Sequence, residues 1–310
     1  MKWVKRFILL VFIISLGFGA YEVYQLQQRD VTGPKLTCED EEISASIQDG
    51  HEELMKGVKA IDKQDGDITN SLLIERIEKN LSGADNEFMI SYAAFDHSNN
   101  IGTLTRKLRY TDYHKPRFTI SSPLRFSQNE EFSLIQYVKA DDCLDGDISP
   151  FIKIEGEDKI NKDSKAGIYD CVLQVTNSAG DTATLPVKVE IYEDSYEERN
   201  FVPKIILKQY VVYLSQGDAF KPTEYLDYVY DQSTLSVDYG PMVQIEENGE
   251  KKEVTEAETK NKSGDWVNIS KIKFASNVDT RKKGNYSVVY IYTTASQEYT
   301  CNAELLVVVE

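Results

Sequence analysis

A twelve-residue segment occurs twice in this chain, and this repeat limits what the chain can fold into. The run from Val58 to Thr69 matches the run from Val138 to Ser149 at nine of twelve positions, counting one Thr/Ser exchange. The run from Asp96 to Leu104 then matches the run from Asn177 to Leu185 at an offset that differs by a single position. Two separated matches at nearly one offset indicate an array of related units, and a period of roughly 80 residues is that of a domain.

A third, partial copy follows the first two. The run from Phe126 to Phe132 reappears as Leu214 to Phe220, and a tyrosine stands five residues after each run. Each unit also opens with a proline and a basic residue, at Pro34, Pro116 and Pro203. We therefore expect a stem over 25–33 and three domains over 34–115, 116–193 and 203–310. A linker over 194–202 joins the last two domains, and the third has an insertion at about 246–266.

The first residues of the chain predict a membrane helix. Lys2, Lys5 and Arg6 precede an uncharged apolar run, Phe7 to Ala20, which further apolar residues extend to Tyr24. Because basic residues stay on the cytoplasmic side, residues 1–6 are expected in the cytoplasm and the domains outside. We expect residues 7–24 to be an uncleaved transmembrane signal anchor, which makes the protein a single-pass membrane protein. The alternative is a cleaved signal peptide and a secreted protein.

The charge of the chain excludes one class of partner. The formal net charge is −16. The segment 1–30 has four basic and two acidic side chains, a net of +2, so the rest of the chain carries −18. A surface this acidic repels phosphate backbones, which argues against a nucleic-acid partner. The expected partners are the membrane, through the N-terminal helix, and a protein or glycan ligand.

Alternating apolar residues with turns between them predict antiparallel strands. In the second unit, Tyr169, Cys171 and Leu173 alternate with other residues up to the turn-rich run from Asn177 to Asp181, and a second alternating run follows up to Ile191. This is the pattern of a β-hairpin. Short strands, little helical periodicity and a domain-sized repeat predict an all-β chain of tandem β-sandwiches.

Three motifs of the second unit carry a resemblance to a known family. They are Asp-Gly-Asp-Ile-Ser, Lys-x-Gly-x-Tyr and Asn-Ser-Ala-Gly-Asp-Thr-Ala-Thr. This pattern resembles the bacterial Ig-like domain that occurs in tandem on surface proteins of Gram-positive bacteria and as a module of a pesticidal crystal toxin. Residues 34–115 share the Asp-Gly-Asp loop but have Asn99 where the family has Gly, and residues 203–310 match only in part. The resemblance implies antiparallel Ig-like sandwiches at a cell surface and no particular activity.

The Asp-Gly-Asp loops offer a candidate metal site. Several carboxylates near a glycine provide the oxygen ligands that Ca²⁺ prefers, although the spacing is not that of an EF-hand. The competing interpretation, which we favour, is that these aspartates accept backbone N–H bonds within tight turns and that no cofactor is bound. The candidate residues are Asp62, Asp65, Asp67, Asp141, Asp142, Asp145 and Asp147.

Tyrosines and cysteines supply the remaining candidates. Ten of the 19 tyrosines lie in the third unit, where Tyr228 and Tyr230 stand in place of the acidic loop and are our candidates for an exposed ligand-binding patch. Cys143 and Cys171 share a unit and could form a disulfide, but we favour Cys171 as a buried thiol. No nucleophile motif, phosphate-binding loop or close histidine cluster is present, so we expect no enzyme.

Two functions remain open at this point. The first is a membrane-anchored cell-surface protein that binds or adheres through its distal Ig-like domain. The second is a structural spacer or assembly component of the cell envelope without a ligand of its own. An exposed apolar patch on the third unit would favour binding, and a charged surface there would favour the spacer.

Overall fold

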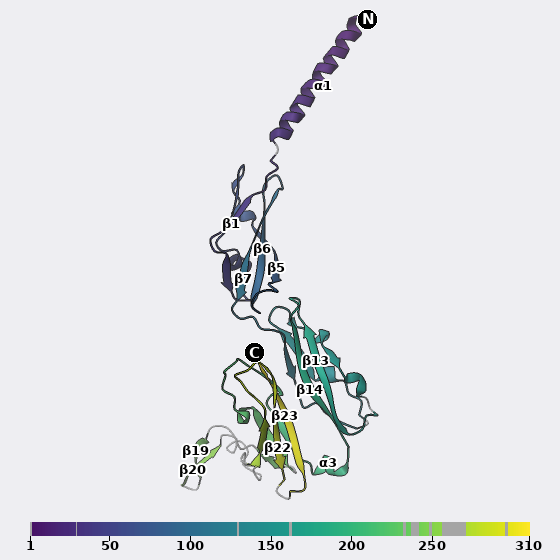
Figure 1. The fold of residues 1–310 in the computed structure, drawn as a ribbon, viewed down its shortest axis with the longest axis vertical. Helices are drawn as coiled ribbons and strands as arrows, with labels where there is room; N and C mark the ends of the chain where they lie inside the picture. The colour runs from purple at the N-terminus through teal and green to yellow at the C-terminus, as the bar shows by residue number, and fades with distance from the viewer. Residues whose placement is uncertain are drawn as a thin grey trace. The chain divides into compact units, whose positions relative to one another are not determined.

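The structure is a computed structural model that describes residues 2–28, 30–128, 130–160, 163–231, 234–236, 242–247, 250–255, 271–294 and 297–310. The chain divides into two compact units, unit 1 from Met1 to His114 and unit 2 from Lys115 to Glu310. Figure 1 shows one N-terminal helix followed by strands. The predicted fold class, all-β sandwiches preceded by one apolar helix, is confirmed.

Unit 1 begins with helix α1, Lys2–Gln28, which extends beyond the predicted span at both ends. Its stretch from Trp3 to Tyr24 is long and apolar enough to cross a membrane, with a mean hydropathy of 2.0 and no residue buried inside the protein. A long apolar helical stretch that no protein core covers is typical of a membrane span. This length and composition are found both in membrane anchors and in N-terminal signal sequences.

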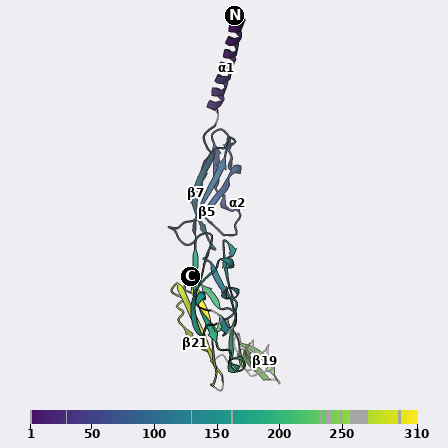
Figure 2. The same cartoon turned by 90° about the vertical axis from the view of Figure 1, so that its right-hand side faces the viewer.

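The first sandwich of unit 1 consists of two sheets (Figures 1 and 2). The order of the smaller sheet is β1-β3-β4, and that of the larger is β2-β7-β6-β5. All pairings are antiparallel except that between β2 and β7. The bounds are β1 Lys35–Cys38, β2 Glu42–Ala45, α2 His51–Leu54, β3 Val58–Asp62, β4 Gly66–Asp67, η1 Thr69–Ser71, β5 Leu73–Lys79, β6 Glu87–Phe95 and β7 Ile101–Tyr110.

Unit 2 repeats this arrangement in a second sandwich. Its sheets have the orders β11-β10-β8 and β12-β13-β14-β9, again with one parallel pair, β14 with β9. The hairpin of β13 and β14 is the one that the sequence predicts (Figure 1). The bounds are β8 Arg117–Ile120, β9 Arg125–Ser127, η2 Leu134–Gln136, β10 Val138–Asp142, β11 Gly146–Asp147, η3 Ser149–Phe151, β12 Lys153–Glu155, η4 Glu157–Lys159, β13 Gly167–Thr176 and β14 Thr182–Tyr192.

The third sandwich follows a short helix, α3, in the segment that joins it to the second. Its sheets have the orders β15-β17-β18 and β16-β23-β22-β21, and β19 pairs with β20 in a separate hairpin. Residues 248, 249 and 256–266 of the predicted insertion lie outside the described residues. The bounds are α3 Tyr196–Asn200, β15 Lys204–Leu207, β16 Val211–Leu214, η5 Pro222–Tyr225, β17 Leu226–Asp231, β18 Thr234–Ser236, β19 Met242–Glu247, β20 Glu250–Thr255, β21 Lys273–Ser276, β22 Gly284–Thr293 and β23 Thr300–Val309.

The turn between β6 and β7 adopts a left-handed conformation without a glycine. Asn99 has a φ of +63°, and Gly180 at the equivalent place of the second sandwich has a φ of +86°. Asparagine tolerates this left-handed conformation better than most residues, because its short polar side chain can hydrogen-bond locally. The sequence change at Asn99 therefore preserves the turn.

The cores follow the alternation of the strands. Ile90, Tyr92 and Ala94 on β6 are fully buried, and Cys171 lies buried on β13 as a free thiol. In unit 2 the buried apolar residues of both sandwiches form one continuous cluster. Ile120 from the second sandwich and Tyr210 from the third line one small cavity of about 110 Å³. The two sandwiches of unit 2 therefore share a core.

Tyr213 joins the two sandwiches of unit 2 and makes their stability depend on pH. Its Oη accepts a hydrogen bond from the backbone N–H of Phe118 at 2.6 Å, and burial raises the pKa of Tyr213 to about 12. The folded protein therefore favours the neutral phenol of Tyr213. Because an unfolded tyrosine ionises near pH 10, the stabilisation from keeping Tyr213 neutral is complete below pH 10 and is lost as the pH rises toward 12. A difference of about two units between the folded and unfolded pKa of Tyr213 corresponds to a loss of about 3 kcal/mol in the free energy of unfolding over this pH range.

We therefore expect Tyr213→Phe to destabilise unit 2 most at neutral pH. At pH 8 the variant should lose about 1 to 2 kcal/mol, because the N–H of Phe118 loses its acceptor. At pH 11.5 the gap between wild type and variant should shrink, because only the wild type must keep Tyr213 protonated. Urea unfolding of both proteins at the two pH values measures the gap, and a gap that stays constant would contradict the assignment.

Candidate functional site

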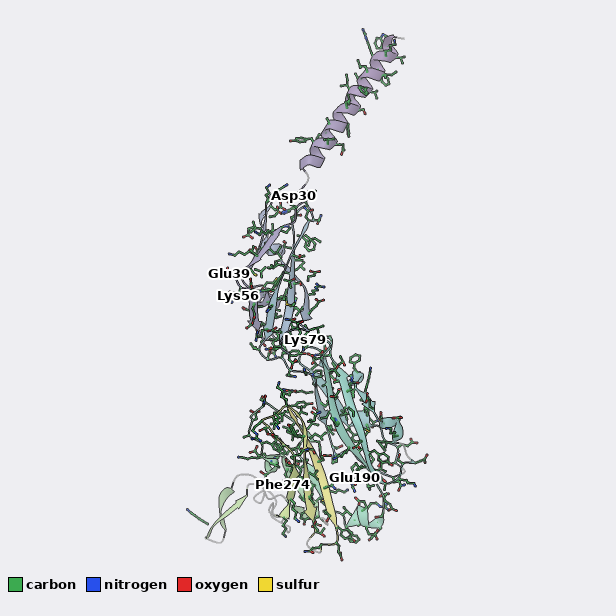
Figure 3. The ribbon with its side chains drawn as sticks, in the orientation of Figure 1. Asp30, Glu39, Lys56, Lys79, Glu190 and Phe274 are labelled. Carbon is green, nitrogen blue, oxygen red and sulfur yellow. The ribbon has the colours of Figure 1, made fainter. Side chains whose placement is uncertain are left out.

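Three buried carboxylates meet at one end of the first sandwich. Asp30 follows α1 by two residues, Asp62 ends β3, and Asp96 follows β6. Their side chains each offer one oxygen, and these oxygens lie within 4.8 Å of one another. The three residues are only 4 to 6% exposed. Figure 3 shows Asp30 where the chain leaves the helix and reaches the sandwich. We call these three residues the aspartate cluster.

Hydrogen bonds hold each member of the aspartate cluster in place. Asp30 Oδ1 accepts from the backbone N–H and the hydroxyl of Thr32, at 3.0 and 2.8 Å. Asp62 Oδ1 accepts from two backbone N–H groups in its own turn. The Asn100 side-chain amide donates to the carbonyl oxygen of Asp30 at 3.1 Å and to Asp96 Oδ2 at 2.8 Å. The amide therefore connects the stem to the β6–β7 turn.

One oxygen of the cluster is left over. Asp30 Oδ2 is buried and has no hydrogen-bond partner among the described residues. The stem segment, residues 30–34, packs closely against the start of β7. A Cβ atom at Gly33 would lie 2.3 Å from the carbonyl oxygen of Ile101, and one at Gly102 would lie 1.9 Å from that of Pro34. Only glycine fits at these two positions. The resulting close contact between the two backbones holds the stem segment, and with it Asp30, against the sandwich.

The electrostatics of the aspartate cluster are unfavourable without a cation. Backbone N–H groups of Asp65 and Gln64 lower the pKa of Asp62 and favour its charged form. Within the part of the chain that the structure describes, no Lys, Arg or His side chain forms an ion pair with Asp30, Asp62 or Asp96. Buried like charges repel, so they require a proton or a bound cation.

In the second and third sandwiches, the carboxylate at the position of Asp62 has a different kind of partner. Asp142, the equivalent of Asp62, accepts a hydrogen bond from the side-chain amide of Asn177 at 3.0 Å. Asp231, at the end of the corresponding strand of the third sandwich, accepts one from the Tyr292 hydroxyl at 2.8 Å. In both cases a neutral donor satisfies the carboxylate. Among the described residues, only the first sandwich places another carboxylate, Asp96, at this position.

The other predicted acidic residues take part in turns. Asp67 accepts from the N–H and hydroxyl of Thr69, and Asp147 accepts from the N–H of Ser149. The side-chain hydroxyl of Thr69 is the main cause that lowers the pKa of Asp67, and that of Ser149 is the main cause for Asp147; the two backbone N–H groups add to this effect. Both loop glycines, Gly66 and Gly146, have the positive φ that such tight turns need.

The remaining acidic residues of the two loops lie outside the aspartate cluster. Asp65 accepts from the N–H of His97, and Asp145 accepts from the N–H and hydroxyl of Ser178, so each ties its loop to the neighbouring hairpin. Asp141 is exposed. Of the seven predicted metal ligands, only Asp62 belongs to the cluster, and the sequence did not single out Asp30 or Asp96.

The predicted tyrosine pair lies on β17. Tyr230 is 40% exposed and pairs with Lys204, whereas Tyr228 is half-buried and pairs with Ile206. Tyr290 and Tyr292 on β22 are buried in the core. The pair therefore offers one exposed ring.

A cleft of about 630 Å³ lies between the second and third sandwiches within unit 2. Tyr137, Tyr192 and Tyr299 supply aromatic groups to its wall, and Glu190 and Arg125 are among the charged groups. Glu190 is labelled in Figure 3. Arg125 bonds to Glu190 and Glu198, which raises its pKa although burial opposes this, and its guanidinium lies 4.1 Å from the centre of the Tyr192 ring. The cleft combines aromatic faces with carboxylate acceptors.

Comparison with known proteins gives no family assignment. No family model matches the chain. An uncharacterised 81.3 kDa protein of Acholeplasma phage L2 is 30% identical over 118 residues, which are 37% of this chain and 16% of that protein. The chain therefore spans about a sixth of the length of this relative.

Solved structures share only low overall similarity with the chain. Drosophila N-cadherin EC1-4 has a TM-score of 0.25 at 10% identity and covers 87% of this chain and 73% of its own. The lipoprotein BT2262 of Bacteroides thetaiotaomicron has a TM-score of 0.23 at 14% identity, over 62% of this chain and 98% of its own. A structure of CBM51-2 in complex with GlcNAc and INT domains, from Clostridium perfringens ZmpB, has a TM-score of 0.20 at 16% identity. The match covers 49% of this chain and 26% of that one. At these scores the likeness carries no argument about function.

Proposed function

We propose that this chain is a non-enzymatic, membrane-anchored cell-surface protein of the bacterial Ig-like type that binds a ligand through unit 2. The observation that carries the proposal is the cleft between the second and third sandwiches. Its volume of about 630 Å³ suits a small ligand or a segment of a larger one. Because both sandwiches line it, the shared core of unit 2 would keep its walls in place.

The chemistry of the cleft favours a neutral glycan as the ligand. Tyrosine rings supply apolar faces for sugar rings, and carboxylates accept hydrogen bonds from hydroxyl groups. Tyr299 stacks on Phe201 at 5.8 Å between ring centres, which fixes its orientation. Lys204 and Ile206 also line the cleft, and their strand partners are Tyr230 and Tyr228. We therefore place the predicted tyrosine pair beside the cleft as a secondary contact.

The membrane anchor completes the proposal. Helix α1 contains the apolar stretch from Trp3 to Tyr24, and Lys2, Lys5 and Arg6 at its start favour a cytoplasmic N-terminus. The two units would then be displayed outside the cell. Signal cleavage would instead release them, and the mass of the mature protein distinguishes the two.

Binding to immobilised neutral oligosaccharides tests this function. The full chain in phosphatidylcholine nanodiscs should bind at least one oligosaccharide of a panel, and Tyr299→Ala should weaken that binding about tenfold through loss of ring contact. Phe151→Ala is the matched control, because Phe151 is a 66% exposed aromatic residue that does not line the cleft. Equal binding by both variants, or no binding to any oligosaccharide, would overturn the proposed site.

The spacer remains the second candidate function, and one observation favours it. Among the described side chains of residues 203–310, Tyr230 is the only large apolar residue that is exposed. A surface with so little exposed apolar area suits a solvated spacer rather than an adhesive face. The absence of binding in the oligosaccharide experiment would favour this candidate.

A further inference from the structure

The aspartate cluster combines Asp62 from the Asp-Gly-Asp motif with two residues outside that motif, Asp30 and Asp96. The geometry points to a Ca²⁺ site formed by Asp30, Asp62 and Asp96, which holds the stem segment against the first sandwich. The site has two independent indications: three buried carboxylates face one another, and Asp30 Oδ2 is a buried acceptor without a donor among the described residues. It is independent of the cleft in unit 2.

The distances fit a calcium ion. Ca²⁺ binds oxygen ligands at 2.3–2.6 Å, so two oxygens on one ion lie no more than about 5 Å apart. The three carboxylate oxygens lie within 4.8 Å of one another. Ca²⁺ accepts several carboxylates in irregular geometry, whereas Mg²⁺ prefers to keep several waters and a strict octahedron. Water molecules would supply the remaining ligands.

The charges also fit. Three carboxylates carry a formal charge of −3 in a place that is 4 to 6% exposed, and no described basic side chain pairs with them. A divalent cation would neutralise most of this charge and give Asp30 Oδ2 a partner. The Asn100 amide already donates to Asp96 and to the backbone of Asp30, so it orients these groups toward the ion.

The second sandwich shows how the same position is satisfied without an ion. Asn177 aligns with Asp96 and donates its amide to Asp142. Replacing Asp96 by asparagine should therefore reproduce the arrangement of the second sandwich. The expected variant is a first sandwich that is stable without Ca²⁺ and no longer responds to it.

The stem segment gives the ion a structural consequence. Asp30 is the member of the aspartate cluster that belongs to the stem, and Gly33 and Gly102 allow the stem to lie against β7. The other two ligands belong to the sandwich, Asp62 as the last residue of β3 and Asp96 directly after β6. A bound ion would thus fix the segment that connects α1 to the first sandwich, and its removal would release that segment.

Calcium titration of the full chain tests the site. The chain is placed in phosphatidylcholine nanodiscs, because anionic lipids would themselves bind Ca²⁺. Calorimetric titration should show a single Ca²⁺ per chain, and millimolar Ca²⁺ should raise the unfolding midpoint of unit 1 by roughly 10 °C relative to EDTA. Hydrogen exchange of residues 30–34 and 96–102 should slow when Ca²⁺ is added. Absence of binding in the wild type would overturn the proposal.

Three variants locate the ion. Asp30→Asn and Asp96→Asn should each abolish the Ca²⁺-dependent rise, and Asp96→Asn should unfold at a higher temperature than the wild type in EDTA. Asp67→Asn is the matched control: it removes a loop carboxylate that binds Thr69 rather than the cluster, so the rise should persist. A full response in Asp30→Asn would overturn the site, and an equal response of the wild type to Mg²⁺ would overturn its assignment to calcium.

Discussion

Replacing Arg106 with methionine should destabilise unit 1 by about 3 kcal/mol and lower its unfolding midpoint by roughly 10 to 20 °C. Arg106 lies on β7 and is only 4% exposed. Its Nε donates to the Tyr92 hydroxyl at 2.8 Å, and its Nη2 donates to the carbonyl oxygens of Leu54 and Lys56 at 2.8 and 3.0 Å. Methionine fills similar space without donors, so the Tyr92 hydroxyl and the Lys56 carbonyl oxygen would lose the Arg106 donor, whereas the Leu54 carbonyl oxygen would keep only its bond from the Tyr92 hydroxyl.

Arg109→Met is the control for this prediction. Arg109 lies on the same strand, but its side chain is 41% exposed and pairs with Glu42 and Glu87. Solvent reaches the Arg109 side chain and screens both pairs, although Glu87 is only 15% exposed, so we expect a loss of less than about 1 kcal/mol. Thermal unfolding of the full chain, with hydrogen exchange on β6 and β7 to assign the transition to unit 1, measures both variants. Equal losses would show that the Arg106 network is not a major source of stability.

The sequence predicts the sandwiches because its apolar residues alternate with the period of a strand. The hairpin of β13 and β14 and the buried faces of β6 and β22 follow directly from this pattern. Arg106 breaks it. The repeat aligns Arg106 with Val187, which is buried and only 3% exposed. A basic residue at an apolar position of a repeat was therefore a visible signal of a buried polar network.

The aspartate cluster could be predicted only in part. Asp62 is part of the repeated motif, but Asp30 and Asp96 come from segments far from it on either side in the sequence, and only the folded sandwich brings them together. The alignment of Asp96 with Asn177 was the available signal, because it places a carboxylate where the better-matching unit has an amide. Of the seven aspartates in the two turn motifs, six lie outside the cluster.

The shared core of unit 2 could not be predicted from periodicity. Alternation identifies which residues of a strand face the interior of its own sandwich, but it does not show which outer surfaces pack against a neighbouring sandwich. Ile120 and Tyr210 contribute to such a contact although they lie in different repeats. The linker predicted over 194–202 contains helix α3, whose Glu198 binds Arg125.

Replacing Arg125 with methionine should destabilise unit 2 by about 3 kcal/mol, through the contact between the second sandwich and α3. The Arg125 side chain is 26% exposed, lies 3.1 Å from Glu190, and donates to Glu198 on α3. The variant would leave both carboxylates without this partner in a half-buried place, which costs more than the pair itself contributes. The midpoint of unit 2 should fall by about 5 to 10 °C.

Two comparisons make the Arg125 prediction specific. Lys188→Met removes the Lys188 contact with Glu304, which spans 3.5 Å with the lysine 54% exposed, so the expected loss is below about 1 kcal/mol. A double-mutant cycle of Arg125→Met with Glu198→Gln should give a coupling of about 1 to 3 kcal/mol. Hydrogen exchange should become faster across residues 196–200 in Arg125→Met and stay unchanged in Lys188→Met. A coupling near zero would mean that α3 is held by the apolar contacts of Phe201 with Tyr196 and Tyr299 rather than by the ion pair.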